Sequence, residues 1–205
     1  MSLRFRLLSC LLTCLLPPCA WAQATILVLG DSLSAAHGMP VESGWVALLS
    51  QRLAESGGDR HVVNASISGE TTAGGLARLP ALLDEHRPEV VLIGLGANDG
   101  LRGLPIGQIR DNLAAMVAQA RQAGAKVVLL GIELPVNFGR RYRSELRAVY
   151  AQLAQAHGLA LVPFLLEGVA LDPQLVQDDG LHPTAQAQPR ILENVWPVLG
   201  RVLSE

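Results

Sequence analysis

Five short apolar segments alternate along this chain with segments whose apolar residues recur at helical spacing. Each apolar segment is a continuous run, as expected for strands of a parallel sheet that is buried on both faces. The expected strands cover residues 25–29, 62–63, 90–95, 127–132 and 160–163. Strands and helices that alternate without internal repeats or a linker predict one α/β domain with helices on both faces of its sheet.

The expected helices lie between these strands and after the last one. They cover residues 45–54, 71–85, 106–123 and 143–157, and a terminal helix opened by Pro183 that reaches about residue 203. We therefore predict a three-layer α/β/α fold around a five-stranded parallel sheet. The natural strand order for such a doubly wound, flavodoxin-like sheet is 2-1-3-4-5.

The first 22 residues have the features of a secretory signal peptide. Arg4 and Arg6 make a positive start, residues 7–16 are apolar, and residues 20–22 supply the small side chains of a cleavage site. We expect cleavage after Ala22, which leaves residues 23–205 as a single domain in the periplasm or outside the cell. A lipid anchor at Cys19 is the alternative.

Cysteine content and charge exclude several classes of protein. All three cysteines of the chain lie in the first 22 residues, so the domain has no disulfide, thiolate metal site or cysteine nucleophile. The formal net charge is −2, and no basic cluster indicates binding to nucleic acid or a membrane surface. We expect a monomer without metal, cofactor or stable membrane anchor, acting on a small molecule.

The first strand runs directly into the sequence Gly-Asp-Ser-Leu-Ser at residues 30–34. Gly30 permits a sharp turn, which places Ser32 at the carboxyl end of the strand. Sites in open α/β sheets form outside the carboxyl ends of the strands, so Ser32 stands where a nucleophile can be presented. The alternative is a serine that caps the next helix or closes a turn.

Two further strand ends carry possible hydrogen-bond donors. Gly69 lies in the loop after the second strand, and Asn98 follows the third strand directly. The backbone N–H groups of Ser32 and Gly69 and the side-chain amide of Asn98 provide three donors for a developing oxyanion. Taken alone, Asn98 is equally compatible with an Asx turn.

A nucleophilic serine needs a general base, and the chain has five histidines, at positions 37, 61, 86, 157 and 182. His182 follows Asp179 by three residues, which brings a carboxylate within hydrogen-bond reach of its imidazole. Pro183 disfavours a helical conformation at His182 and keeps it in a loop. His37 follows the Ser32 turn closely and could line the same site.

Four short blocks together resemble the SGNH (GDSL) serine hydrolases. They are residues 30–34, 68–69, 96–99 and 179–182, which stand in the family's order at strand ends. The resemblance implies that Ser32 is the nucleophile, His182 the general base and then acid, and Asp179 the carboxylate that orients it. It also implies that Ser32, Gly69 and Asn98 form the oxyanion hole.

Residues 64–72 and 139–142 look like one subgroup of that family, the bacterial periplasmic thioesterase/protease/lysophospholipase and the related arylesterases. This resemblance implies a carboxylic ester hydrolase that works through an acyl-enzyme intermediate, without metal or cofactor. Its expected substrates are aryl esters, short-to-medium acyl esters, acyl thioesters and lysophospholipids.

The subgroup has a mobile substrate-binding loop after the fourth strand. The corresponding residues here are Leu134, Pro135, Asn137, Phe138 and Tyr142. This chain departs from the subgroup at Glu133 and over residues 136–138, and we expect an altered acyl-chain preference from these changes.

Two alternatives stay open at this level. A carbohydrate O-acetylesterase of the same fold would carry the same catalytic residues, because fold and triad do not determine the substrate. A flavodoxin-like binding module would use the same strand-end crevice without catalysis. Such a module has no need of the Asp179–His182 pair.

Overall fold

The computed structural model describes residues 24–57 and 59–205 of the chain. The expected signal peptide at residues 1–22 lies outside these residues. Five parallel strands form one sheet in the order β2-β1-β3-β4-β5, which confirms the predicted strand order. The strands are β1 (Ala24–Gly30), β2 (Arg60–Asn64), β3 (Val90–Gly94), β4 (Lys126–Leu130) and β5 (Ala160–Val162).

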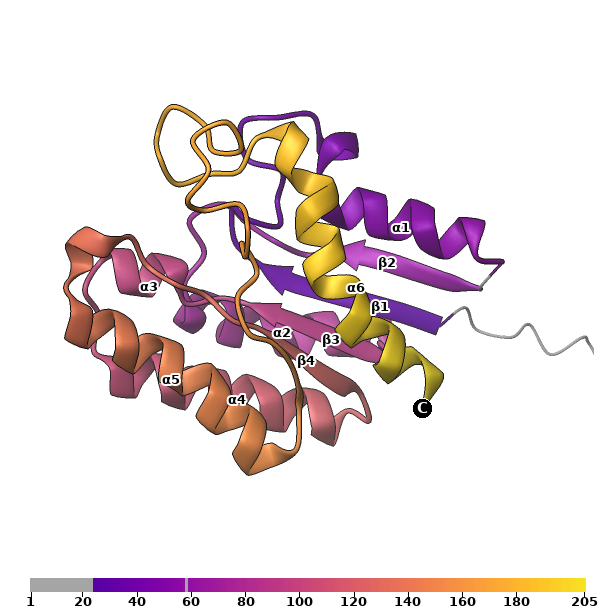
Figure 1. Cartoon of the computed structure of the whole chain (residues 1–205). Coiled ribbons are helices and arrows are strands. Elements are labelled where there is room, and N and C mark those ends of the chain that lie inside the picture. Colours follow the sequence, from indigo (N-terminus) through magenta and orange to yellow (C-terminus); the bar gives the residue numbers. More distant parts are fainter. Residues whose placement is uncertain (1–23, 58) are drawn as a thin grey trace, which may run out of the picture.

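Helices cover both faces of the sheet, as predicted (Figure 1). Helices α1 (Trp45–Glu55) and α6 (Gln188–Ser204) pack together on one face. The other face is covered by α2 (Thr72–His86), α4 (Ile106–Gln122) and α5 (Arg140–His157). Within residues 24–57 and 59–205, no helix has the length and apolar content needed to cross a bilayer.

The core lies between the sheet and its two helical layers. All five residues of β3 are buried, whereas the residues of the edge strand β2 are all at least partly exposed. This difference explains why the central strands are continuous apolar runs. Tyr150 of α5 is also fully buried, and its hydroxyl donates to the Leu95 carbonyl over 2.8 Å, so its polar atom has a partner.

Three helix predictions are wrong in detail. A short helix, α3 (Ala97–Leu101), follows β3 where a loop was expected, because five residues are too few to show a helical period. Helix α5 begins at Arg140, three residues earlier than predicted. The terminal helix begins at Gln188 after the 3₁₀ turn Ala185–Ala187, whereas Pro183 pairs with Val176 in an isolated bridge.

Two more short 3₁₀ helices lie in the loops at the carboxyl edge of the sheet. They are η1 (Val41–Ser43), before α1, and η2 (Val136–Phe138), before α5. The loops after β1 and β3 and the long segment before α6 meet at this edge (Figure 1). The fold thereby gathers residues that are more than 100 positions apart in the sequence.

Candidate active site

The turn after β1 is shaped by its own first residues. Asp31 is buried, its Oδ1 accepts from the Leu33 N–H over 3.0 Å, and its carbonyl accepts from the Ser34 N–H over 3.1 Å. A Cβ added to Gly30 would lie 2.9 Å from the Ser34 Cβ, closer than real contacts allow. The tight turn therefore requires glycine at position 30, and it presents Ser32 at the end of the strand.

Other elements fix this turn from outside. The Trp45 indole donates to the Leu33 carbonyl over 3.1 Å, and the Asn64 amide donates to the Ser34 carbonyl over 2.8 Å. The buried Gln188 of α6 accepts from the Trp45 backbone N–H over 3.0 Å. The position of Ser32 is thus tied to α1, α6 and the end of β2.

Ser32, His182 and Asp179 form a continuous hydrogen-bonded chain. His182 Nε2 lies 2.9 Å from Ser32 Oγ, and His182 Nδ1 lies 2.5 Å from Asp179 Oδ2. Asp179 Oδ1 accepts from the backbone N–H groups of Leu181 and His182, both over 2.9 Å. In such an arrangement the imidazole can accept the hydroxyl proton while the carboxylate stabilises the resulting imidazolium.

The Asp179 carboxylate is held in its charged form. The His182 backbone N–H, followed by the His182 imidazole and the Leu181 N–H, lowers its pKa to about 2 against a small opposing effect of burial. Asp179 is therefore ionised at every pH at which the folded enzyme would be assayed. The adjacent Asp178 is exposed, and it provides a matched control for Asp179.

Three possible oxyanion donors lie close to Ser32. Asn98 lines the same cavity as Ser32, and one hydrogen of its amide is engaged by the Glu70 carbonyl at 3.0 Å. Gly69 has φ +81, a conformation that favours glycine, and Arg102 donates to its carbonyl over 3.0 Å. Within residues 24–57 and 59–205, the backbone N–H groups of Ser32 and Gly69 have no hydrogen-bond acceptor.

A buried carboxylate anchors the helix that carries Asn98. Asp99 accepts from the Thr72 backbone N–H over 2.9 Å and from the Thr72 hydroxyl over 2.5 Å. Asn112 of α4 donates to that hydroxyl over 3.0 Å. These contacts fasten α3 to the start of α2, so the position of Asn98 depends on a polar network that the sequence does not reveal.

Asp31 is the most perturbed carboxyl group of the site. Burial raises its pKa to about 6, although the Leu33 N–H and the charge of His182 act in the opposite direction. The second hydrogen of the Asn98 amide faces Asp31 Oδ2 at 3.3 Å, which is a weak contact. The carboxylate is therefore poorly compensated in the folded protein.

The raised pKa of Asp31 predicts a pH-dependent stability. The folded state favours the protonated acid, so this contribution is complete below the unfolded pKa of about 3.8 and is lost as pH rises through about 6. The free energy of unfolding should fall by at most about 3 kcal/mol over that interval, since one pKa unit is worth about 1.4 kcal/mol. Asp31→Asn should remove this decline, measured by urea unfolding from about pH 4 to about pH 7.

Asp178→Asn serves as the control, because an exposed carboxyl should leave the wild-type pH profile intact. Asp179 does not interfere above about pH 4, since its lowered pKa affects stability only below the unfolded value. A decline that persists unchanged in Asp31→Asn would assign it to another group.

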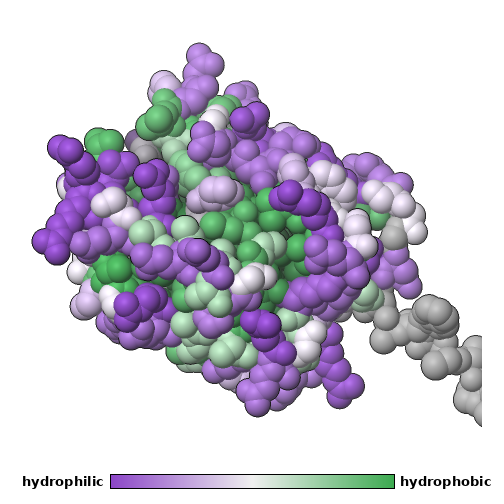
Figure 2. Space-filling view, turned by 60° about the horizontal axis from the view of Figure 1, so that its bottom comes forward, coloured by the Kyte–Doolittle hydropathy of each residue, from purple (hydrophilic) through white to green (hydrophobic). Residues whose placement is uncertain are grey.

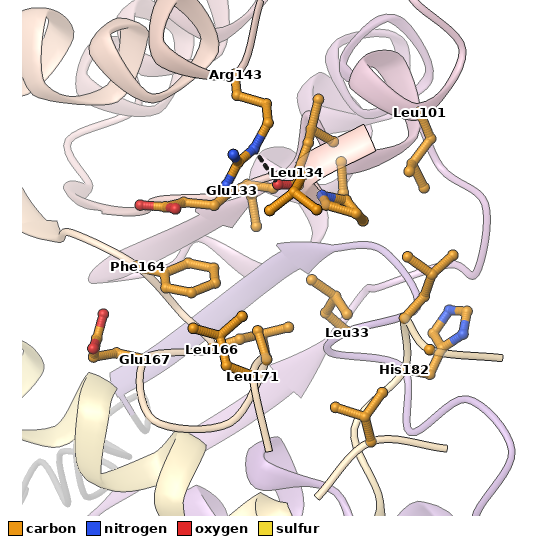
Figure 3. Close-up of a pocket in the computed structure, with 18 of the residues that line it drawn as sticks. Leu33, Leu101, Glu133, Leu134, Arg143, Phe164, Leu166, Glu167, Leu171 and His182 are labelled. Carbon is orange, nitrogen blue, oxygen red and sulfur yellow. Dashed lines mark hydrogen bonds between the residues drawn. The ribbon is translucent and has the colours of Figure 1, made fainter. Parts of the chain in front are cut away.

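A cavity of about 590 Å³ opens beside Ser32 and His182. The surface view in Figure 2 shows apolar side chains gathered around a hollow and bordered by hydrophilic ones. Figure 3 shows His182 at one end of the cavity and Glu133 and Glu167 at the other. Its walls are mainly apolar and include Leu33, Leu101, Leu134, Phe164, Leu166 and Leu171.

The far end of the cavity is charged. Arg147 pairs with Glu133 over 3.0 Å, and Arg143 donates to the Leu134 carbonyl over 2.7 Å (Figure 3). The Glu133 side chain thus has a cationic partner, and Arg143 fixes the loop after β4. An apolar body with few polar groups at its ends is typical of a small-molecule site.

Only part of the predicted substrate-binding loop reaches this cavity. Leu134 and Pro135 line it, whereas Asn137, Phe138 and Tyr142 do not. The Tyr142 hydroxyl instead donates to the Leu104 carbonyl over 2.5 Å, and the Tyr142 and Phe138 rings pack against the core. The prediction for these three residues is wrong because the 3₁₀ turn and the early start of α5 direct their side chains elsewhere.

The opposite wall was missed. Residues 164–171, predicted to be irregular, contribute Phe164, Leu166 and Leu171 to the cavity. Leu171 is 94% exposed overall although it borders the cavity. The one available signal was the density of apolar residues in a segment without regular structure, which is unusual for a surface loop.

Comparison with known proteins agrees with this geometry. The chain is 57% identical to Esterase TesA of Pseudomonas aeruginosa over 194 residues, covering 95% of this chain and 96% of that protein. It is 47% identical to Thioesterase 1/protease 1/lysophospholipase L1 of Escherichia coli K12, covering 85% of this chain and 82% of that protein.

Solved structures show the same fold. The psychrotrophic esterase EstA from Pseudoalteromonas, solved with monoethylphosphonate as inhibitor, superposes with a TM-score of 0.84 at 41% identity, covering 88% of this chain and 99% of that one. The family model described as GDSL-like lipase/acylhydrolase matches residues 28–189, which is most of the chain. The chain therefore belongs to the GDSL-like lipase/acylhydrolase family.

Proposed function

We propose that this hydrolase cleaves carboxylic esters through an acyl-enzyme formed on Ser32. The observation that carries the proposal is the hydrogen-bonded chain of Ser32, His182 and Asp179 at the mouth of an apolar cavity. The family assignment makes the chain an enzyme of the ester-hydrolase class. It therefore rules against the non-catalytic binding module.

In the first half of the reaction, Ser32 Oγ attacks the carbonyl carbon of the ester. His182 Nε2 takes the hydroxyl proton, and Asp179 stabilises the imidazolium. The carbonyl oxygen becomes an oxyanion that accepts hydrogen bonds from the Ser32 and Gly69 N–H groups and from the Asn98 amide. When the carbonyl re-forms, the alcohol leaves with the proton from His182, and the acyl group stays on Ser32.

The second half repeats these steps with water as the nucleophile. His182 takes a proton from water, the hydroxide adds to the acyl carbon, and the same donors stabilise the second oxyanion. Collapse breaks the bond to Ser32 Oγ, which regains its proton from His182 and releases the carboxylic acid. The free enzyme is then restored without a cofactor or metal in either step.

The substrate range follows from the open apolar cavity. We include aryl esters, short-to-medium acyl esters, acyl thioesters and lysophospholipids, since the relatives carry the names esterase and thioesterase/lysophospholipase. The acyl chain would lie along the walls formed by Leu134, Leu166 and Leu171. The leaving group would remain in solvent, and for this reason the head group should matter less than the acyl chain.

An acyl-chain series at a fixed 4-nitrophenol leaving group tests this range. We expect kcat/KM to rise by up to about fourfold per methylene from acetyl to medium chains, since each buried methylene contributes up to about 0.8 kcal/mol. Leu171→Ala should reduce this gain for the longer chains. Val41→Ala is the matched control, because Val41 is 63% exposed and does not line the cavity.

A strong preference for acetyl over every longer chain would instead favour the carbohydrate O-acetylesterase. An equal gain in the Leu171→Ala and Val41→Ala variants would place the acyl chain elsewhere.

Export and assembly also belong to this proposal. Cleavage after Ala22 would release residues 23–205 as a single domain into the periplasm or the medium, where acyl-CoA is not made. Thioesters would then be cleaved in vitro without being the natural substrate. We further propose that the enzyme is a monomer, because the described site is complete within one chain.

A further inference from the structure

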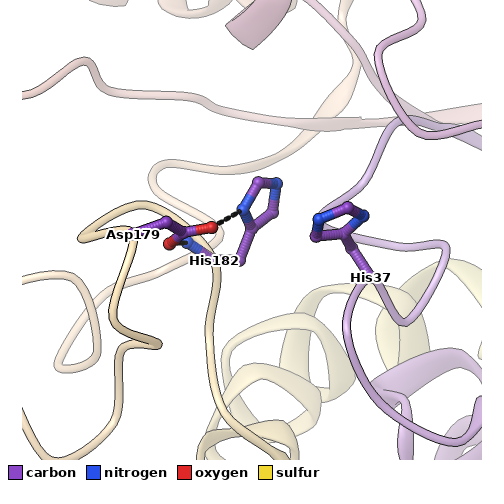
Figure 4. A group of neighbouring side chains, drawn as sticks. All are labelled: His37, Asp179 and His182. Atoms are coloured by element: carbon purple, nitrogen blue, oxygen red, sulfur yellow. Dashed lines mark hydrogen bonds and ion pairs between the residues drawn. The ribbon is translucent and has the colours of Figure 1, made fainter.

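A second histidine lies against the catalytic one. His37, from the segment after β1, stacks on His182 with ring centroids 4.2 Å apart and planes tilted by 37°. Figure 4 shows His37 on the side of His182 away from Asp179. One ligand atom from each of these three residues lies within 4.8 Å of the other two.

The two loops that carry this cluster are joined by Gln177. Its side-chain amide donates to the His37 carbonyl and to the Pro183 carbonyl, both over 2.9 Å, and its backbone N–H donates to the His182 carbonyl over 2.7 Å. A Cβ added to Gly38 would lie only 2.4 Å from the Gln177 side chain. The approach of His37 to His182 is thus fixed by the backbones of both loops.

We infer that His37, Asp179 and His182 form a binding site for Zn²⁺ whose occupation switches the esterase off. Two imidazoles and one carboxylate, with a water in the fourth position, are an established tetrahedral zinc ligand set. Ligand atoms at 2.0–2.2 Å from one ion lie at most about 4.4 Å apart. The cluster therefore needs only a small contraction, which the exposed His37 and Asp179 side chains can supply.

Inhibition follows from the role proposed for His182, on which this part of the inference rests. Both ring nitrogens of His182 are used in catalysis, Nδ1 toward Asp179 and Nε2 toward Ser32. A cation on either nitrogen takes a lone pair that the reaction needs: on Nε2 it displaces the Ser32 hydroxyl, and on Nδ1 it displaces the proton shared with Asp179. Mg²⁺ and Ca²⁺ prefer oxygen ligands and should have little effect.

The test uses the full chain, with Cys10, Cys14 and Cys19 changed to serine so that they do not bind zinc themselves. Calorimetric titration with Zn²⁺ should show one site per chain, and Zn²⁺ should inhibit hydrolysis reversibly with EDTA. His37→Gln should raise both the dissociation constant and the inhibitory concentration by at least about tenfold, since even residues outside the ligand shell affect metal affinity 10–100-fold. Its activity without zinc should stay at the parent level.

His61→Gln is the matched control, since His61 is an exposed histidine on the edge strand β2. It should bind zinc and respond to it like the parent. Equal inhibition of the His37→Gln and His61→Gln variants, or equal inhibition by Mg²⁺, would overturn the site. Zinc that binds through His37 without slowing hydrolysis would retain the site and contradict the role of His182, so the two failures can be told apart.

Discussion

Asp179→Asn is expected to lower kcat by about 10⁴-fold with little change in KM, the scale of the same change in a serine-protease triad. The asparagine can keep the two contacts of Oδ1 with the Leu181 and His182 N–H groups, so the loop should stay in place. Its amide would donate to His182 Nδ1, where the carboxylate now accepts. The imidazole proton is then forced onto Nε2, which can no longer accept the Ser32 proton.

Asp178→Asn is the control for this experiment. Asp178 carries the same carboxyl group one residue earlier in the same loop, and it is exposed. We expect less than a few-fold loss for it in steady-state assays of a short acyl ester. Labelling of Ser32 by a fluorophosphonate should slow in parallel with kcat in the Asp179 variant. Small and equal losses in both variants would mean that another carboxylate orients the base.

The fold was predictable because its strands are buried on both faces. The β1, β3 and β4 sequences have few polar residues to confuse their assignment, and the helices between them show clear periods. The strand order followed from the preference of such sheets for one topology. Errors occur where local patterns are short or tertiary pairing dominates, as at α3 and at the bridge between Val176 and Pro183.

The candidate site was predictable where its residues are adjacent in sequence to a strand end or to each other. Ser32 and Asn98 follow strands, and Asp179 reaches His182 within one turn of chain. The placement of His37 on His182 could not be predicted, because it depends on contacts between segments about 140 residues apart. The raised pKa of Asp31 was hidden for a similar reason, since it comes from burial by the assembled fold.

The cavity walls show the same limit. The loop after β4 was expected to supply the contacts to the acyl chain, but side-chain direction in a 3₁₀ turn cannot be derived from composition. Leu134 and Pro135 face the cavity, while Phe138 turns to the core. The larger share of the apolar wall comes from residues 164–171, which are close to Ser32 only because β5 is the neighbour of β4 in the sheet.

Asn98 is the donor whose role is most sharply separable from binding. Its amide has two hydrogens, one bonded to the Glu70 carbonyl at 3.0 Å and the other only weakly engaged by Asp31 at 3.3 Å. The first contact fixes the plane of the amide, and the second is easily exchanged for a stronger acceptor. An oxyanion formed on the acyl carbon next to Ser32 would be such an acceptor, because charge-assisted hydrogen bonds are about twice as strong as neutral ones.

Asn98→Ala should therefore lower kcat by about 10²–10³-fold and leave KM nearly unchanged, because the lost hydrogen bond strengthens only as charge develops in the transition state. Asn137→Ala provides the comparison, since Asn137 is an exposed asparagine in the loop after β4 that does not line the cavity. It should keep kcat and KM at the wild-type level. Thermal unfolding of the Asn98 variant would show whether the lost contact with Glu70 loosens α3. A change confined to KM in a stable Asn98→Ala protein would place this amide in ground-state binding, and the oxyanion would then rest on the Ser32 and Gly69 N–H groups alone.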